Sequence, residues 1–173
     1  STRTTTNLTE GMMGYDIDAV YSPDGKYIAW LSMERDGYEA DKNNIFIQDL
    51  ETGKKMNLTK NYPETVSSIV FGENSSTVYF LSPTQATYQY FSIDVPKKIS
   101  AGAKTAYRTI TKGDHNYNAL FHGGGKLIGT RQDMTRANEV FSVDIKSGKE
   151  TRLTKVNDNV YNSIKDVKVE KRW

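Results

Sequence analysis

A short element that ends in threonine recurs four times along this chain of 173 residues. Leucine or isoleucine comes directly before each threonine, and the four threonines are Thr9, Thr59, Thr111 and Thr154. Successive threonines lie 50, 52 and 43 residues apart. The blades of β-propellers repeat every 40 to 50 residues, roughly. The repeat therefore predicts a chain that is built from stacked units of one blade each.

Each interval contains four short strand patterns that are joined by turns. In the first interval, alternating apolar residues run from Asp16 to Tyr21, and a second run covers Tyr27 to Leu31. Between them lies Ser22-Pro23-Asp24-Gly25, in which proline presets φ at the second turn position and glycine tolerates a positive φ. Thr52-Gly53 and Ser147-Gly148 occupy matching positions before the fourth strand pattern of their units. These turns predict antiparallel hairpins.

We therefore expect an all-β fold, a β-propeller fragment of about three four-stranded antiparallel blades. The expected blades cover approximately residues 14–59, 65–111 and 117–154, with partial strands at 1–9 and 160–169. Closed propellers usually have about four or more blades, so we expect an incomplete ring. We also expect its open blade edges to favour self-association. A compact sandwich of two sheets is the structural alternative, in which the repeat would be a coincidence.

Composition excludes several classes of protein. Lys and Arg number 23 against 21 Asp and Glu, and this balance indicates neither a nucleic-acid nor a membrane-surface partner. There is no cysteine, which excludes disulfides, thiolate metal sites and a cysteine nucleophile. The Gly-x-Ser-x-Gly, Walker, dinucleotide-binding and His-Glu-x-x-His motifs are all missing from the sequence. We therefore expect no catalytic residue, no metal and no cofactor in this chain.

The densest polar segment runs from Ser32 to Lys42, between the second and third strand patterns of the first unit. Long charged loops on a rigid β scaffold are frequent binding sites. Glu34, Glu39 or Asp41 could bind a cationic group such as the N-terminus of a peptide. Arg35 could bind a carboxylate through two hydrogen bonds. A solvated loop whose charges pair with one another is the alternative interpretation.

Arg131 begins a second polar segment, 131–136, in the equivalent loop of the third unit. Its two arginines and one aspartate could line the same end of a propeller as the loop of the first unit. We therefore include Arg131 among the candidate substrate-binding residues. Ordinary surface charge is the alternative for this segment.

The stretch from Tyr21 to Trp30, followed by a Leu-Thr blade ending, resembles the repeat of periplasmic TolB-type propellers. It also resembles the propeller repeat of the prolyl oligopeptidase family of serine peptidases. The stretch from Trp30 to Lys42 is more similar to the dipeptidyl-peptidase and acylaminoacyl-peptidase branch of that family, in its bacterial form. Residues Val169 to Trp173 are similar to the strand through which such propellers lead into the peptidase domain. The resemblance covers essentially the whole chain.

This resemblance implies a parent protein with a propeller of about seven or eight blades before a C-terminal α/β-hydrolase domain. That domain would carry the catalytic Ser, Asp and His, and it is absent from this sequence. The propeller would cap the active site and admit only short or unstructured peptides. We therefore expect a non-catalytic substrate-gating segment of a serine exopeptidase that releases dipeptides or acylated amino acids. Its expected partners are its own hydrolase domain and a peptide substrate.

In dipeptidyl peptidases of this family, an acidic propeller segment binds the free amino group of the substrate. The adjacent Glu-Glu pair of that segment is missing here, so Glu34, Glu39 and Asp41 are candidates by loop position alone. The resemblance favours a periplasmic or secreted location, and a cytoplasmic location stays open.

A TolB-type protein-interaction propeller without peptidase activity is the alternative function, and it would have a protein partner. A carbohydrate-active propeller enzyme is a third possibility, which would need paired carboxylates that face a central pocket. Asp16, Asp18 and Glu39 are available for such a pair, but no pattern in the sequence marks two of them as partners.

Overall fold

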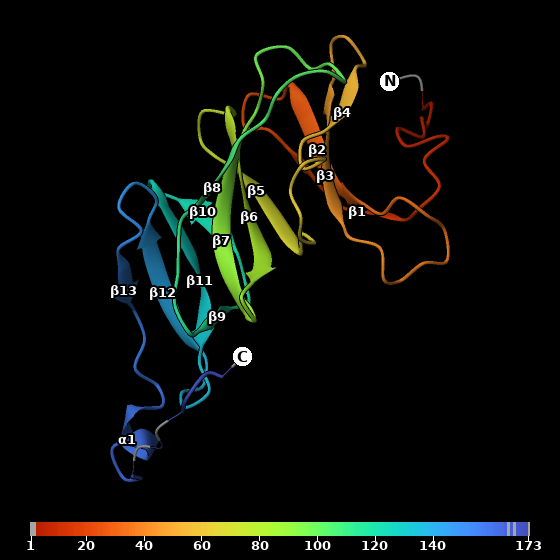
Figure 1. The fold of residues 1–173 in the computed structure, drawn as a ribbon. Coiled ribbons are helices and arrows are strands. Elements are labelled where there is room, and N and C mark those ends of the chain that lie inside the picture. Colours follow the sequence, from red (N-terminus) through yellow and green to blue (C-terminus); the bar gives the residue numbers. More distant parts are fainter. Residues whose placement is uncertain (1–2, 166, 168, 173) are drawn as a thin grey trace.

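The computed structural model describes residues 3–165, 167 and 169–172, which form three antiparallel sheets (Figure 1). Blade 1 contains β1 (Asp16–Tyr21), β2 (Tyr27–Ser32), β3 (Asn44–Asp49) and β4 (Lys55–Asn57). Blade 2 contains β5 (Ser68–Phe71), β6 (Thr77–Thr84), β7 (Thr87–Asp94) and β8 (Tyr107–Thr109). Blade 3 contains β10 (Phe121–Gly123), β11 (Lys126–Gln132), β12 (Glu139–Asp144) and β13 (Glu150–Arg152), and β9 (Asn116–Tyr117) pairs with the end of β11. The expected all-β fold of antiparallel blades is confirmed.

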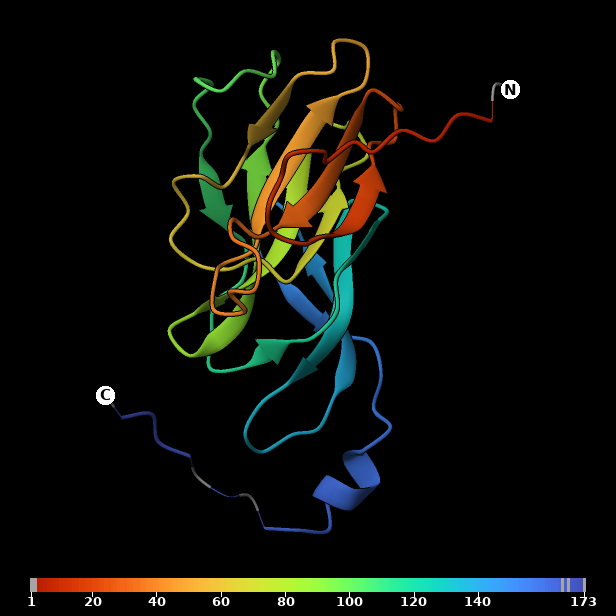
Figure 2. The ribbon, with the colours of Figure 1, turned by 90° about the vertical axis from the view of Figure 1, so that its right-hand side faces the viewer.

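The three blades stand side by side in chain order (Figures 1 and 2). β5, the first strand of blade 2, packs against both β1 and β10, which are the first full strands of the neighbouring blades. The first strands therefore follow one side of the molecule, and the fourth strands follow the other side. This is how blades are arranged around a propeller axis. The arrangement is open, since no other sheet of the described residues covers the outer face of blade 1 or of blade 3.

Blade 2 is the centre of the hydrophobic core because both of its faces are covered. Consecutive side chains of a strand point to opposite faces of the sheet. In β6, Val78 and Phe80 pack in the cluster shared with blade 1, whereas Tyr79 and Leu81 pack in the cluster shared with blade 3. All four side chains are buried. This double burial explains why residues Val78 to Leu81 of β6 form an unbroken apolar run, as is typical of strands that are covered on both faces.

The recurring threonine ties the fourth strand of each blade to the third strand. Its hydroxyl oxygen accepts a hydrogen bond from the backbone amide of one third-strand residue, with N···O distances of 2.8, 2.9 and 2.9 Å in blades 1 to 3. The leucine or isoleucine before the threonine donates its own amide to the carbonyl of that same third-strand residue. The three sets are Leu58-Thr59 with Ile45, Ile110-Thr111 with Tyr90, and Leu153-Thr154 with Val140. The sequence repeat is therefore a repeated hydrogen-bonding device.

The turns between first and second strands connect neighbouring blades. The predicted turn of blade 1 forms, with the Gly25 amide donating to the Ser22 carbonyl at 2.9 Å and a φ of +70° at Gly25. Ser75 takes the same place in blade 2, with a φ of +59°. Its hydroxyl accepts a hydrogen bond from the Asp24 amide at 3.1 Å. The first two blades are thus joined at this end by a hydrogen bond as well as by their core.

The partial strands that were expected at 1–9 and 160–169 do not form in the described residues. Residues 3–7 have no regular structure and are followed by a turn, and Asp158–Tyr161 forms the short helix α1. Residues 1, 2, 166 and 168 lie outside the described residues. A strand needs a neighbour for its backbone hydrogen bonds, and no sheet in the described chain pairs with these segments. No helix in this part of the chain is long and apolar enough to cross a bilayer.

A glycine fits the contact between blades 2 and 3. The Tyr90 ring stacks on the Tyr117 ring with centroids 4.1 Å apart, and the Tyr90 hydroxyl donates to the Ala119 carbonyl at 2.5 Å. A Cβ atom at Gly129 would lie only 2.1 Å from both the Tyr90 hydroxyl and the Ala119 carbonyl. A methyl group there would displace a fully buried tyrosine, so this position requires glycine.

We predict that Thr59→Val lowers the free energy of unfolding by about 1–3 kcal/mol, because the buried Ile45 amide loses its acceptor while side-chain volume is kept. Urea unfolding followed by circular dichroism measures this change. Thr151→Val, at an exposed position on β13, is the matched control and should change stability by less than about 0.5 kcal/mol. Equal effects of the two substitutions would contradict the role that the structure gives to the threonine hydroxyl.

We also predict that Gly129→Ala destabilises the chain by about 1–3 kcal/mol or more, because the added methyl group has no space between Tyr90 and Ala119. Gly123→Ala is the control in the same blade, since a Cβ atom there meets no atom within 4 Å. Thermal unfolding of the two variants compares them directly. A Gly129→Ala protein as stable as the Gly123→Ala protein would show that the blades separate more easily than their packing indicates.

Candidate functional site

Loops of unequal length gather at one end of the blades. The connections between second and third strands cover residues 33–43 in blade 1, 85–86 in blade 2 and 133–138 in blade 3. Because neighbouring strands run in opposite directions, these connections lie opposite the Ser22–Gly25 turn, together with the links between blades (Figure 1). We call this the loop end. Binding residues are often found on loops that a rigid scaffold positions, so we look for a site at this end.

Two of the predicted site residues, Arg35 and Asp41, bind each other. The Arg35 Nε donates to Asp41 Oδ2 at 2.9 Å, the Arg35 backbone amide donates to the same oxygen at 3.1 Å, and Arg35 Nη2 also donates to the carboxylate. The guanidinium lies 4.1 Å from the centre of the Tyr38 ring. The hydrogen bond from Arg35 lowers the pKa of Asp41, and the same bond raises the pKa of Arg35. The loop is therefore closed on itself by this pair.

Glu34 and Glu39 extend from the same loop and are both exposed. Neither carboxylate makes a hydrogen bond or an ion pair with the described residues. Glu34 borders an open depression of about 650 Å³, which Met12, Lys42 and Lys60 also line. These two glutamates are the predicted site residues whose charge is available to a cationic ligand.

Arg131 is held inside its own blade. Its Nη1 donates to Glu150 Oε2 at 2.5 Å, and its guanidinium carbon lies 4.6 Å from the centre of the Phe141 ring. His115, in the link from blade 2, brings its Nε2 to 3.4 Å from the other Glu150 oxygen. Burial opposes the ionisation of Glu150, but the contact with His115 and the charge of Arg131 outweigh it and lower the pKa of Glu150. The structure thus does not bring Arg131 together with the loop of blade 1.

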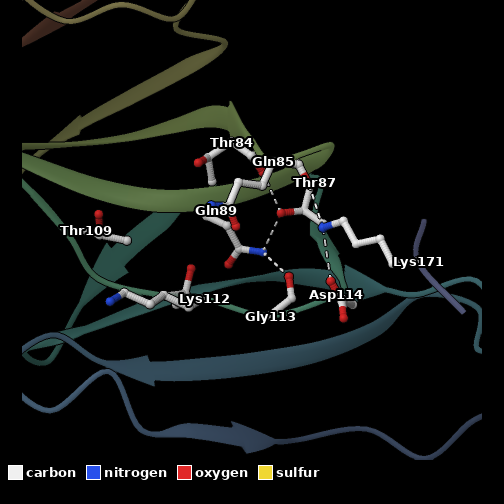
Figure 3. Close-up of a pocket in the computed structure, with 10 residues that line it drawn as sticks. Thr84, Gln85, Thr87, Gln89, Thr109, Lys112, Gly113, Asp114 and Lys171 are labelled. Atoms are coloured by element: carbon white, nitrogen blue, oxygen red, sulfur yellow. Dashed lines mark hydrogen bonds and ion pairs between the residues drawn. The ribbon is translucent and has the colours of Figure 1, made fainter. Parts of the chain in front are cut away.

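A pocket of about 320 Å³ at the loop end was not expected from the sequence (Figure 3). It lies between the beginning of β7 and the link from blade 2 to blade 3. The buried Gln89 side chain donates to the carbonyls of Gly113 and His115 at 3.2 and 2.8 Å, which fixes this link. The lining residues are Thr84, Gln85, Thr87, Gln89, Thr109, Thr111, Lys112, Gly113, Asp114 and Lys171. An amide residue in an aromatic run, Tyr88 to Phe91, is the sequence feature that could have indicated a buried polar contact.

The C-terminal segment returns to this pocket. Lys171 donates to the Gln85 carbonyl at 2.6 Å and forms an ion pair with Asp114 at 3.1 Å (Figure 3). The end of the described chain therefore lies at the loop end, beside blade 2. Within the described residues, no group of three or more His, Cys, Asp or Glu side chains is arranged to hold a metal ion. What the loop end offers is exposed carboxylates, ammonium groups and hydroxyls, which suit binding contacts.

A buried carboxylate stabilises the beginning of β12 at the loop end. Glu139 accepts hydrogen bonds from the Thr154 hydroxyl, from the amides of Val156 and Asn157 at 3.3 and 3.0 Å, and from Arg152 at 3.2 Å. The bond from Thr154 is the largest of several contributions that lower the pKa of Glu139 to about 2. The third blade-closing threonine therefore joins this network through its hydroxyl proton.

We predict that Glu139 makes the stability of the chain pH-dependent in acid. Its pKa of about 2 in the folded chain lies below the value of about 4.3 expected in the unfolded chain. The contribution is therefore complete above that unfolded value and is lost as the pH falls toward 2. Glu139→Gln should flatten the fall of the unfolding free energy across this range, as urea titrations at several pH values would measure. Glu51→Gln, at an exposed turn position, is the control, and equal slopes in both variants would contradict the assignment.

Comparison with known proteins gives relatives that match this chain along essentially its whole length. No protein-family model matches this chain. Dipeptidyl-peptidase 5 of Porphyromonas endodontalis is 37% identical over 173 residues, which are 100% of this chain and 24% of that protein. Dipeptidyl-peptidase 5 of Porphyromonas gingivalis is 34% identical over 170 residues, which are 98% of this chain and 24% of that protein. The chain thus spans about a quarter of the length of these relatives.

A solved structure supports the fold independently. The β-propeller domain of the Trilobed protease from Pyrococcus furiosus, which has an open velcro topology, aligns with 84% of this chain and 40% of its own length. The TM-score is 0.61 and the sequence identity is 21%. At this identity the likeness carries the fold alone, and that fold is a propeller.

Proposed function

Because this chain is a peptidase-family β-propeller segment, of the kind found in dipeptidyl-peptidase 5, we propose that it gates substrate access in a serine exopeptidase. The parent would release dipeptides or acylated amino acids from peptides, and this segment would take no part in the bond-breaking step. The observation that carries the proposal is the 34–37% identity, along essentially the whole chain, to proteins with peptidase names. The missing Gly-x-Ser-x-Gly motif supports a nucleophile located elsewhere in the parent.

The geometry suggests how such a gate would work. Blade cores are close-packed, so the loop end is held on a rigid support, and only an extended or short peptide would pass between such supports. Glu34 and Glu39 offer carboxylates for the amino terminus of a peptide, which carries a positive charge at neutral pH. The Arg35–Asp41 pair would hold the loop that presents them. Release of dipeptides requires that the chain end be measured from a fixed point, and a fixed carboxylate supplies one.

A protein-interaction propeller of the TolB type is less well supported. The relatives with identity over the whole chain have peptidase names, and the TolB interpretation has no comparable support in sequence. A hydrolase domain as the neighbour of this segment is consistent with the larger peptidases that it resembles.

The proposal predicts a division of labour that can be measured. The 173-residue chain alone should neither hydrolyse dipeptidyl chromogenic substrates nor react with a fluorophosphonate probe. A protein that extends this chain to the length of its relatives should do both. In that longer protein, Glu34→Gln combined with Glu39→Gln should raise KM about tenfold for peptides with a free amino end, since a charge-assisted contact is lost. The reactivity of the serine toward the fluorophosphonate should stay unchanged.

Two comparisons test the role of the two glutamates and the non-catalytic role of the isolated chain. Peptides with a blocked amino end should respond to the double substitution no more than to Glu51→Gln, which changes a glutamate at the opposite end of blade 1. Hydrolysis by the isolated chain would overturn the non-catalytic role. An unchanged KM for free peptides in the double variant would remove the two glutamates from the gate while leaving the peptidase assignment in place.

A further inference from the structure

The blade-closing threonines differ in what their hydroxyl protons meet. Each hydroxyl oxygen accepts an amide of the third strand, so its own proton needs a separate acceptor. In blade 1, the side-chain oxygens of Asn44 and Asn57 lie 3.4 and 3.3 Å from the hydroxyl oxygen and accept this proton. In blade 3, the Glu139 carboxylate accepts it. Thr111, which closes blade 2, donates no hydrogen bond to any described residue.

The residue before the third-strand amide explains this difference. Gln89 occupies in blade 2 the position that Asn44 has in blade 1 and Glu139 has in blade 3. Its amide nitrogen donates to the carbonyls of Gly113 and His115 at 3.2 and 2.8 Å. Carbonyl oxygens only accept, so the nitrogen has to face them and the amide oxygen has to point elsewhere. Gln89 is 1% exposed, and its oxygen has no hydrogen-bond partner in the described part of the chain.

The unpaired acceptor and the unpaired donor belong to the same pocket. Gln89 and Thr111 both line the pocket of about 320 Å³ at the loop end, and Thr111 is also 1% exposed. They are neighbours because Thr111 binds the amide of Tyr90, the residue after Gln89. In Figure 3 the Gln89 nitrogen faces Gly113, and the oxygen points away from it, toward the side where Lys112 lies. Buried polar groups nearly always have partners, so such a pair indicates bound water or a ligand.

One positive charge of this pocket is also unpaired. The charged residues that line it are Lys112, Asp114 and Lys171. Asp114 and Lys171 form an ion pair at 3.1 Å, whereas Lys112 makes neither a hydrogen bond nor an ion pair with the described residues. The described lining residues include no aliphatic or aromatic side chain. These features favour a ligand that is small, polar and negatively charged.

We propose that this pocket binds an α-amino carboxylate, the group in which an N–H and a carboxylate are attached to the same carbon. The N–H donates to Gln89 Oε1, and the carboxylate accepts from the Thr111 hydroxyl and the Lys112 ammonium. The donor and the acceptors of such a group are separated by one carbon, which suits the neighbouring Gln89 and Thr111. Ligand pockets usually measure about 300–1,000 Å³, so this volume suits one or two amino-acid residues. Free amino acids and the carboxyl ends of short peptides both carry this group.

This site is separate from the proposed gate in blade 1. Glu34 and Glu39 offer negative charge to the amino end of a peptide, whereas Lys112 offers positive charge to a carboxylate. The inference does not rest on the peptidase proposal, because its test measures binding and not hydrolysis.

NMR titration of the isotope-labelled chain with N-acetylglycine and with glycine tests the site. At least one of them should shift the side-chain amide signal of Gln89 saturably, with a Kd below about 10 mM. N-acetylsarcosine and trimethylglycine are the matched ligands without an N–H, and each should bind at least about tenfold more weakly than its parent. Tighter binding of N-acetylglycine would assign the pocket to peptide carboxyl ends. Tighter binding of glycine would assign it to free amino acids.

Two pairs of variants locate the binding. Lys112→Met should weaken it about tenfold, because a charge-assisted contact is lost, whereas Lys146→Met, at an exposed turn position, should leave it unchanged. Thr111→Val and Thr59→Val each remove the acceptor of one third-strand amide, so they carry a similar structural cost. Only Thr111→Val should weaken the binding.

Three results would each overturn the proposal. The first is the lack of a saturable shift at Gln89 with either ligand, which would leave water as the partner of the unpaired groups. The second is equal affinity for the ligands without an N–H, which would show attraction by charge alone. The third is binding that Lys112→Met leaves unchanged, which would place the carboxylate elsewhere.

Discussion

The hydrogen bond from a third-strand amide to a blade-closing threonine is the interaction on which the rest of this structure depends. The fourth strands β4, β8 and β13 have three residues each, which leaves few backbone bonds to hold them. The threonine hydroxyl adds one more acceptor where the sheet ends, and an unsatisfied buried amide there would cost about 1–3 kcal/mol. Because the preceding leucine or isoleucine bonds the same third-strand residue, the device also sets the register. Register then decides which side chains face which neighbouring blade.

From that register follows the division of the core into two clusters. Alternate side chains of β6 point to opposite faces of blade 2, so this one strand packs against both neighbouring blades. The two interfaces are filled differently. Phe80 and Phe91 fill the first, whereas the second has Gly129 where the first has Phe80, and Tyr90 enters the space that this leaves. One repeat thus supports two packing solutions, because a large residue on one blade can be exchanged for a large residue on the next.

The repeat, the turns and several strands could be predicted because they depend on neighbours in sequence. β1 has the bounds that alternation and turn residues indicated, and Gly25 has its expected positive φ. The candidate site could be predicted only in part. Arg35 and Asp41 are six residues apart, and their pairing is a property of the folded loop. The partners of Arg131 and Gln89 lie on other segments, and no local pattern shows which distant groups a buried polar side chain will meet.

The segment before β1 shows where sequence and structure inform each other. Its Asn-Leu-Thr pattern predicted a strand, but residues 3–9 form no strand in the structure. Yet the hydrogen bond from the Thr9 amide to the Asn7 side chain forms without a partner strand. Short-range bonds and one contact with Lys55 of blade 1 therefore hold this segment, whereas a strand needs a neighbour for its backbone hydrogen bonds.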